Sequence, residues 1–144
     1  MIEPDTIKLR RECDAGVRMG TASIRDVQDH AQSRTLQKAL AACLKQHLAL
    51  DAEIRTLLRR YRDEGKAPNP IARAMSRMKT GLRLATGKPD QAVADLMTDG
   101  CHMGVKSLSR YLNQYQAAEE QVKDIAKRLI AAELQLSGDV RAFL

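Results

Sequence analysis

The chain has 144 residues, of which 44% are apolar, and a formal net charge of +6 at pH 7. A chain of about 150 residues buries close to 70% of its unfolded surface, so this length suffices for the core of one domain. Only 3% of the residues are aromatic and none is tryptophan, which excludes an aromatic stacking platform for nucleic-acid bases or sugar rings. A core of Leu, Ile, Val, Ala and Met favours helices over strands. We predict one all-α domain spanning residues 1–144.

The cysteines and the chain's hydropathy indicate a compartment. Cys13, Cys43 and Cys101 form no Cys-x-x-Cys pair and leave an odd count, which fits reduced thiols in a cytosolic protein better than a disulfide framework. The first residues contain no apolar run of the kind that a signal peptide needs, and no stretch approaches the ~18 consecutive apolar residues of a membrane span. We predict a cytoplasmic protein without a transmembrane segment.

The first predicted helix spans residues 4–32. Pro4 suits a first helical turn, where Asp5 adds a favourable negative charge. The expected inward stripe consists of Cys13, Val17, Gly20, Ile24, Val27 and Ala31. Gly16 and Gly20 lie four residues apart on or beside this stripe. Because a glycine inside a helix costs up to about 1 kcal/mol relative to alanine, the pair indicates close approach of another backbone or of a bulky side chain.

The second predicted helix spans residues 34–64, with Ser33 as its cap and Gly65 in the left-handed conformation at its end. Apolar positions recur in steps of four and three: Leu36, Leu40, Cys43, His47, Leu50, Ile54, Leu57 and Tyr61. This spacing is typical of a helix that packs against other helices along its length. The short connection predicts an antiparallel pair with the first helix.

A shorter helix is predicted over residues 70–86, with Asn69 as its cap and Pro70 in the first turn. Its apolar stripe consists of Ile71, Met75, Met78, Leu82 and Ala85. Residues 66–88 hold six cations and no acid, which accounts for the whole formal excess of +6. Four of these cations, Arg73, Arg77, Lys79 and Arg83, make a candidate anion-binding face for nucleic acid or acidic lipid. We favour the alternative in which the apolar side caps the other helices and the cations face water, because the helix has no aromatic residue.

Two further helices are predicted over residues 89–115 and 119–137. Without the turn that we place at 116–118, one helix over 90–136 would be roughly 70 Å long, more than a domain of this size can cover. The expected inward positions are Val93, Met97, Gly100, Gly104, Leu108, Tyr111 and Tyr115 on the first, and Val122, Ile125, Leu129, Ala132, Leu136 and Val140 on the second. Ser137 and Gly138 are expected to end the regular helix. The elements together predict an antiparallel four-helix bundle with a short amphipathic helix in the crossover between its second and third helices.

Several of these features, taken in order, resemble a ferritin-like group of bacterial proteins of unassigned function. The features are Cys13-x-x-Gly16, the His47 seam, the basic stretch from Arg73 to Leu82, and the segment from Gly100 to Tyr111. The resemblance covers most of the chain and implies a ferritin-like fold. It implies no particular activity, because spacing and residue type carry it rather than a catalytic signature.

The ferritin-like resemblance also implies where a metal centre would lie. A di-iron site in that fold takes a glutamate from each of two helices and a Glu-x-x-His pair from each of the other two. His47 and Glu133 match single members of the two pairs, while Leu44 and Leu136 stand where their partners belong. One hypothesis is therefore a metal site, for iron or another divalent ion, reduced to His47 and Glu133, with or without a cysteine as third ligand. The alternative that we favour is a buried polar pair without metal, since histidine can satisfy one buried carboxylate.

Three functional hypotheses follow. The first, which we favour, is a non-catalytic bundle that acts through self-association or a protein partner and needs no cofactor. The second is a ferritin-type redox or storage protein that uses His47 and Glu133. The third is an anion-binding module that uses residues 66–88. No Walker loop, Gly-x-Gly-x-x-Gly motif or nucleophile motif is present, so an enzyme is the less favoured interpretation.

Overall fold

The computed structural model describes residues 3–85 and 87–144, which form five α-helices, one short 3-10 helix and no strand. The α-helices are α1 (Pro4–Gln28), α2 (Arg34–Arg60), α3 (Pro70–Leu84), α4 (Pro89–Gln114) and α5 (Glu120–Val140), and the 3-10 helix covers Arg141–Phe143. The all-helical prediction is confirmed. Among the described residues, no helix is long and apolar enough to span a membrane.

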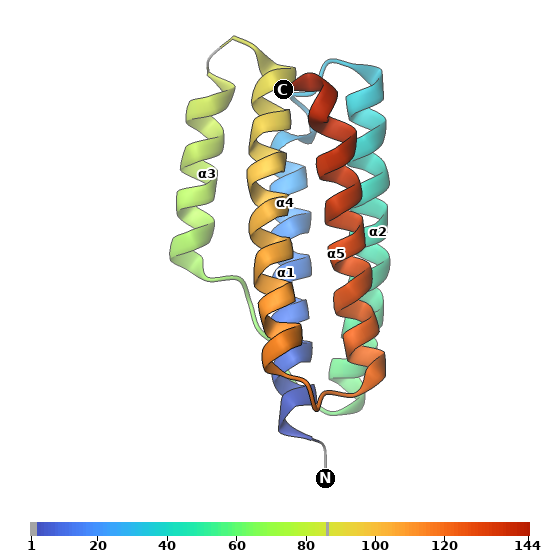
Figure 1. Ribbon diagram of the computed structural model, residues 1–144. Helices are drawn as coiled ribbons and strands as arrows, with labels where there is room; N and C mark the ends of the chain where they lie inside the picture. Colours follow the sequence, from blue (N-terminus) through green and yellow to red (C-terminus); the bar gives the residue numbers. More distant parts are fainter. Residues whose placement is uncertain (1–2, 86) are drawn as a thin grey trace.

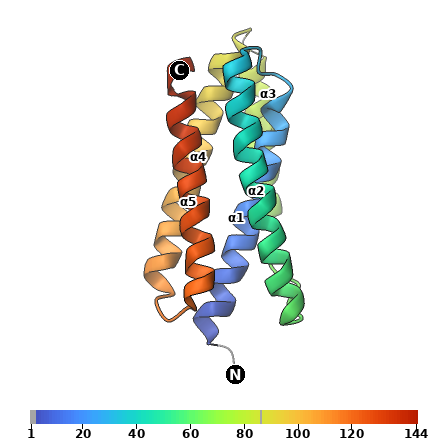
Figure 2. The ribbon, with the colours of Figure 1, turned by 90° about the vertical axis from the view of Figure 1, so that its right-hand side faces the viewer.

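The four long helices lie side by side, and α3 lies outside them (Figures 1 and 2). α1 packs against α2 and α4, α5 packs against the same two helices, and α3 packs against α1 and α4. In Figure 1, α3 carries the chain from the lower end of α2 back to the upper end of α4. As a result α2 and α4 run in the same direction, and each is antiparallel to α1 and α5.

Two of the predicted caps are present. The Ser33 hydroxyl accepts a hydrogen bond from the backbone N–H of Leu36, and the Asn69 side chain accepts from Ile71 and Ala72 at the start of α3. These side chains satisfy N–H groups that a helix end otherwise leaves without partners.

Several helix ends differ from the prediction. α1 ends at Gln28 rather than at residue 32, and α2 ends at Arg60 rather than at residue 64. The first left-handed residue after α2 is Arg62 (φ 52°), ahead of Gly65 (φ 81°), because the N–H of Asp63 already closes the helix end on the carbonyl of Leu58. The predicted last residue of the crossover helix, Thr86, lies outside the described residues.

The last helix continues past Ser137 and Gly138 to Val140, whereas the sequence predicted that it would end there. Leu136 and Val140 are both buried against the other helices, and this packing outweighs the helix-breaking tendency of one glycine. The connection from α4 to α5 lies between Gln114 and Glu120, where the turn was placed.

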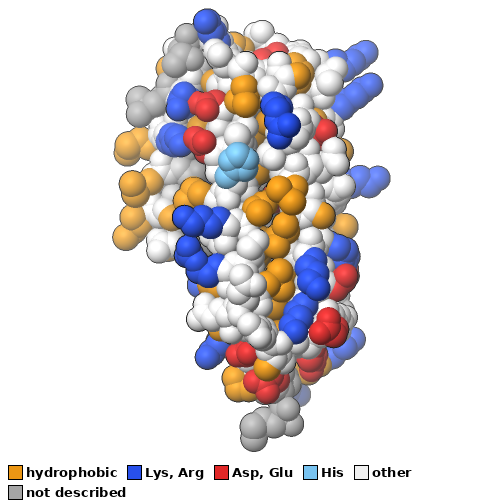
Figure 3. All heavy atoms as spheres, viewed as in Figure 1, with side chains coloured by type: hydrophobic (Ala, Val, Ile, Leu, Met, Phe, Trp, Pro, Cys, Tyr) orange, Lys and Arg blue, Asp and Glu red, His pale blue; other side chains and the backbone are white. Residues whose placement is uncertain are grey.

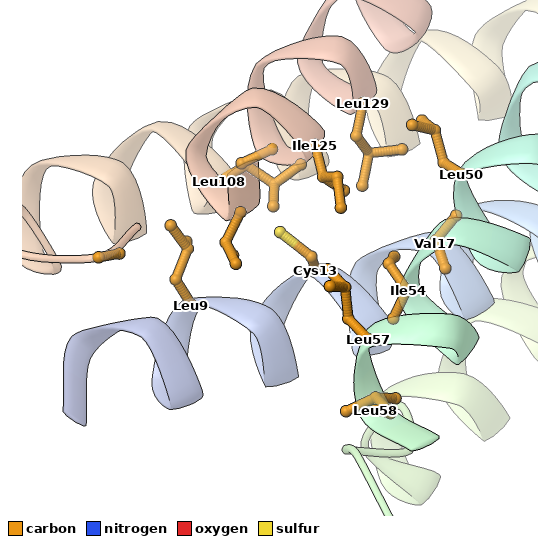
Figure 4. Close-up of a cluster of buried hydrophobic side chains, with 13 residues drawn as sticks. Leu9, Cys13, Val17, Leu50, Ile54, Leu57, Leu58, Leu108, Ile125 and Leu129 are labelled. Atoms are coloured by element: carbon orange, nitrogen blue, oxygen red, sulfur yellow. The ribbon is translucent and has the colours of Figure 1, made fainter. Parts of the chain in front are cut away.

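The buried side chains form two apolar clusters, one toward each end of the long helices. The cluster in Figure 4 contains Leu9, Cys13, Val17, Leu50, Ile54, Leu108, Ile125 and Leu129, among others. The second cluster contains Ile24, Val27, Leu36, Leu40, Cys43, Val93, Met97, Cys101, Leu136 and Val140, among others. The predicted seam positions of α2 from Leu36 to Leu57 are buried, whereas Tyr61 follows the end of the helix and is half-buried. On α4, Gly100 is exposed and Cys101 takes the inward position instead.

The orientation of α3 is opposite to the favoured expectation. Its polar side faces the other helices, where Thr80 is buried, while Ile71, Met75 and Met78 are 72%, 66% and 69% exposed. The side chain of Leu82, expected on the same stripe, lies outside the described residues. The apolar stripes of α1 and α4 are already buried among the long helices. The faces of α1 and α4 that contact α3 therefore carry aspartates, namely Asp26, Asp95 and Asp99.

Candidate functional site

A polar layer separates the two apolar clusters. Between the two clusters, the inward positions are Gly20 on α1, His47 on α2, Gly104 on α4 and Glu133 on α5, with Ala132 buried beside Glu133. The structure therefore brings together the two residues that the sequence singled out, and it adds two glycines from the remaining helices.

His47 and Glu133 approach each other across this layer. The distance from His47 Nε2 to Glu133 Oε1 is 3.8 Å, which is an ion-pair distance rather than a direct hydrogen bond. On its other side, His47 Nδ1 donates to the backbone carbonyl of Cys43 at 2.9 Å. Because a carbonyl oxygen only accepts, Nδ1 carries a hydrogen, and Nε2 is the ring atom that faces the carboxylate.

Both side chains are almost fully buried, with 1% of His47 and 6% of Glu133 exposed. Among the described residues, neither His47 Nε2 nor Glu133 Oε2 has a hydrogen-bond partner. Burial raises the pKa of the Glu133 carboxyl, and the neighbouring His47 only partly opposes this. Burial alone would lower the pKa of His47, but its contacts with Cys43 and Glu133 outweigh that effect and raise it. Both pKa values are thus raised, so the pair releases its protons at a higher pH than the two separate groups would in water.

The two glycines provide the space for this pair. A Cβ atom on Gly20 would lie 2.5 Å from His47 Nε2, and a Cβ atom on Gly104 would overlap Glu133 Oε2. The prediction that Gly20 marks the close approach of a bulky side chain is confirmed. The matching role of Gly104 was missed, although its place on the expected stripe of α4 was the available signal.

The residues of this layer do not fit a di-iron centre. Such a site needs carboxylates from all four helices, whereas two helices contribute glycine here, and the helical positions three residues from His47 and Glu133 are Leu44 and Leu136. Within residues 3–85 and 87–144, no group of three or more His, Cys, Asp or Glu residues is placed to hold a metal ion. Cys43 Sγ lies 3.5 Å from His47 Nδ1, but it contacts the nitrogen that already donates to a carbonyl.

The predicted anion-binding residues lie on α3, and most of them contact acids of the same chain. Arg73 forms a two-point ion pair with Asp26 of α1, with N–O distances of 2.6 and 3.0 Å. Lys79 pairs with Asp99 and Arg83 with Asp95, both on α4. Arg77 is exposed. Three of the four cations therefore hold α3 onto the other helices.

An apolar row occupies the outward side of α3. Ile71, Met75 and Met78 follow one another at helical spacing, and Figure 3 shows apolar side chains gathered along this outer edge of the molecule. Beside them lies a shallow pocket of about 330 Å³, lined by Met75, Met78, Lys79 and Arg83. We refer to Ile71, Met75 and Met78 as the α3 row.

Comparison with known proteins supports the fold. The structure is similar to the crystal structure of a DUF305 fragment from Deinococcus radiodurans, with a TM-score of 0.70 and 12% sequence identity, over 99% of this chain and 94% of that one. Similarity at this low identity shows a shared helical fold and nothing more. The DUF305 domain itself is a domain of unknown function. The sequence matches no protein-family model and no curated protein.

Proposed function

We propose that the protein is a non-catalytic, ferritin-like four-helix bundle that binds another protein surface through the α3 row. The observation that carries this proposal is the orientation of α3, which turns its polar side inward and the apolar side chains of Ile71, Met75 and Met78 outward. The parallel direction of α2 and α4, with α3 between them in sequence, supports the ferritin-like topology. The three buried free cysteines support a reducing, cytoplasmic location.

The α3 row is not required for folding. Each of its side chains is about two thirds exposed or more, whereas burying such a side chain stabilises a protein by about 1.5–3 kcal/mol. A folded chain that leaves three of them in one row on water has an unused source of binding free energy. Two of the three are methionines, which adapt to partners of different shape.

The ion pairs of α3 favour a protein partner over a polyanion. Phosphate recognition needs cations that are free to contact phosphate oxygens, but Arg73, Lys79 and Arg83 contact aspartates. An apolar row bordered by charges that are already paired resembles the centre and rim of a protein interface. A second copy of the chain is the first partner to consider, because most soluble oligomers are homo-oligomers that use the same surface patch on each copy.

A photo-crosslinking experiment tests this proposal. A photoreactive amino acid replaces Met78, and in a matched control it replaces Lys127, an exposed residue of α5. We expect discrete covalent adducts only at position 78, either with a second copy or with one other protein, and their loss when Met75→Asp is added. Equal adduct patterns at both positions would contradict the proposal. Sedimentation velocity over a range of concentrations separates a second copy from a different protein.

A metal site at His47 and Glu133 is the second candidate function. It is favoured by one observation, namely that Nε2 and Oε2 are buried without a hydrogen-bond partner among the described residues. Two ligands, even with one thiol, suit a single ion such as Zn²⁺ better than a pair of irons. Metal analysis of protein purified without chelator tests it: a stoichiometric ion that disappears in both His47→Gln and Glu133→Gln would favour this function.

A further inference from the structure

A separate pocket lies at the end of the molecule where α1 begins and α2 ends. It measures about 470 Å³ and opens to solvent between the first turns of α1 and the segment that follows α2. Three arginines line it: Arg10 and Arg11 from α1, and Arg62 from the segment after α2. None of its lining residues belongs to the α3 row or to the polar layer, so neither of the functions above uses it.

Arg10 places a desolvated positive charge in the wall of this pocket. Its side chain is 2% exposed, its Nη2 donates to Asp63 Oδ2 at 3.2 Å, and its guanidinium lies 4.8 Å from the centre of the Tyr61 ring. Its Nε and Nη1 have no hydrogen-bond partner among the described residues. Buried charged groups are normally paired and fully hydrogen-bonded, so Arg10 is incompletely neutralised by the protein itself.

A single carboxylate serves two guanidinium groups here. Asp63 also accepts from Arg11 Nε, at 3.1 and 3.3 Å, and from the backbone N–H of Gly65. Burial would raise the pKa of Asp63, but these donors hold it below its usual value, so the carboxylate is charged. The two terminal nitrogens of Arg11 contact no acceptor in the described part of the chain. Because half of the Arg11 side chain is exposed, these nitrogens can donate to a ligand in the pocket.

Arg62 is held in an unfavourable backbone conformation at the pocket. Its φ of 52° makes it the one left-handed residue other than glycine among the described residues, and a side chain with a Cβ adopts this conformation at a cost in free energy. Glycine would fit this position more easily. Its exposed guanidinium has no ion-pair partner in residues 3–85 and 87–144. No ion pair of the Arg62 side chain therefore offsets the free-energy cost of its backbone conformation.

We propose that this pocket binds a monoanionic oxyanion, a carboxylate or phosphodiester group on a small organic molecule, with Arg11 and Arg62 as its donors. The charges of Arg10, Arg11 and Arg62 exceed those of the lining acids Asp63 and Glu64 by one, which a monoanion neutralises. Arginine forks match the geometry of carboxylate and phosphate oxygens. The ring of Tyr61 and the side chain of Ile7 provide an apolar wall for the organic part.

The test is a titration of the full chain with benzoate and with diphenyl phosphate at constant ionic strength, monitored through the amide NMR signals of residues 61–65. We expect saturable shifts at Gly65 and its neighbours, and the probe that binds more tightly identifies the source of the oxyanion. Formate serves as the monoanionic probe without an apolar part and should bind more weakly. Shifts that do not saturate, or that follow added chloride equally, would overturn the proposal.

Three variants separate a binding role from general electrostatics. Arg62→Gln should weaken binding about tenfold or more, as expected for the loss of a charge-assisted hydrogen bond. Arg60→Gln, which removes an exposed arginine of α2 outside the pocket, should change it by less than about twofold. Glu64→Gln should tighten binding. Equal losses in Arg62→Gln and Arg60→Gln would refute a specific site.

Arg62→Gly distinguishes function from fold. Because glycine relieves the left-handed strain, we expect the Tm of this variant to equal or exceed that of the natural chain, while anion binding is lost. A fall in Tm would show that Arg62 serves the fold instead. The result is independent of the α3 row, so Met75→Asp should bind the same anion with unchanged affinity.

Discussion

His47 of α2 faces Glu133 of α5 across the centre of the helical core, with 3.8 Å between Nε2 and Oε1, and each has a glycine of a neighbouring helix against it. Apolar clusters lie on both sides of this layer. Two buried ionisable groups with unsatisfied atoms add little net stability by themselves, because desolvation offsets their attraction. Removing only one of them is a different matter, since the other is then left buried without a partner.

The first prediction concerns this pair. His47→Leu should destabilise the protein by about 2–5 kcal/mol, because it leaves the Glu133 carboxyl unpaired in an apolar environment. His47→Leu combined with Glu133→Leu should recover much of that loss. Urea unfolding of the natural chain, both single variants and the double variant gives the four free energies of unfolding. Additive effects of the two substitutions would contradict a coupled pair.

The second prediction uses the glycines. Alanine normally stabilises a helix interior by up to about 1 kcal/mol relative to glycine, yet Gly20→Ala and Gly104→Ala should each destabilise by about 1–3 kcal/mol through overpacking against His47 and Glu133. Gly100→Ala is the matched control on α4, because a Cβ there meets no atom within 4 Å. Thermal unfolding should show a lower Tm for the first two variants and an equal or higher Tm for the control.

Much of this layer was predictable from the sequence. The four-and-three spacing placed His47 on a buried seam, and the cost of glycine in a helix marked Gly20 as a site of close approach. The pairing of Gly104 with Glu133 was not predictable, since it depends on how α4 and α5 are aligned. Spacing defines the face of one helix, whereas the height of one helix against another is set by tertiary packing.

The orientation of α3 shows a second limit. Hydrophobic spacing correctly grouped Ile71, Met75 and Met78 on one face, but it cannot tell whether that face meets the protein or water. The decisive partners, Asp26, Asp95 and Asp99, belong to other helices whose apolar stripes were already satisfied. The sequence placed the end of α2 four residues too late for a similar reason. Contacts of Asp63 with Arg10 and Arg11 of α1 determine the path of the chain there.

The third prediction concerns pH. The pKa of His47 is raised in the folded state, so its contribution is fully present below its unfolded value of 6.5 and is lost as pH rises. Glu133, whose pKa is also raised, acts in the same direction from its unfolded value of 4.5 upward. The free energy of unfolding should therefore fall between pH 6.5 and about pH 7.5, a range in which unfolded cysteine thiols are still largely protonated.

Glu133→Gln provides the comparison for this pH dependence. The variant lacks the carboxylate that favours the imidazolium, so its free energy of unfolding should change less over the same range than that of the natural chain. Urea unfolding at several pH values measures both slopes. A natural chain that gains stability from pH 6.5 to about pH 7.5, or a variant with the same slope, would show that the pair does not titrate in this way.

The last prediction concerns how α3 is attached. Its contacts with α1 and α4 include three ion pairs, of which Lys79–Asp99 and Arg83–Asp95 have side chains about one third to one half exposed, and exposed pairs are screened at about 1 M salt. Amide hydrogens of α3 should therefore exchange with solvent faster in about 1 M than in about 0.05 M NaCl, while those around Leu50 stay protected.

Two variants serve as test and control for this attachment. Arg73→Gln, which removes the two-point contact with Asp26, should speed amide hydrogen exchange of α3 already at low salt. Arg128→Gln removes the pair of Arg128 with Glu53 between α5 and α2, and it should leave α3 unchanged. If salt and Arg73→Gln both leave exchange of α3 unaltered, apolar contacts rather than ion pairs hold this helix, and its outward row is less available to a partner than the structure indicates.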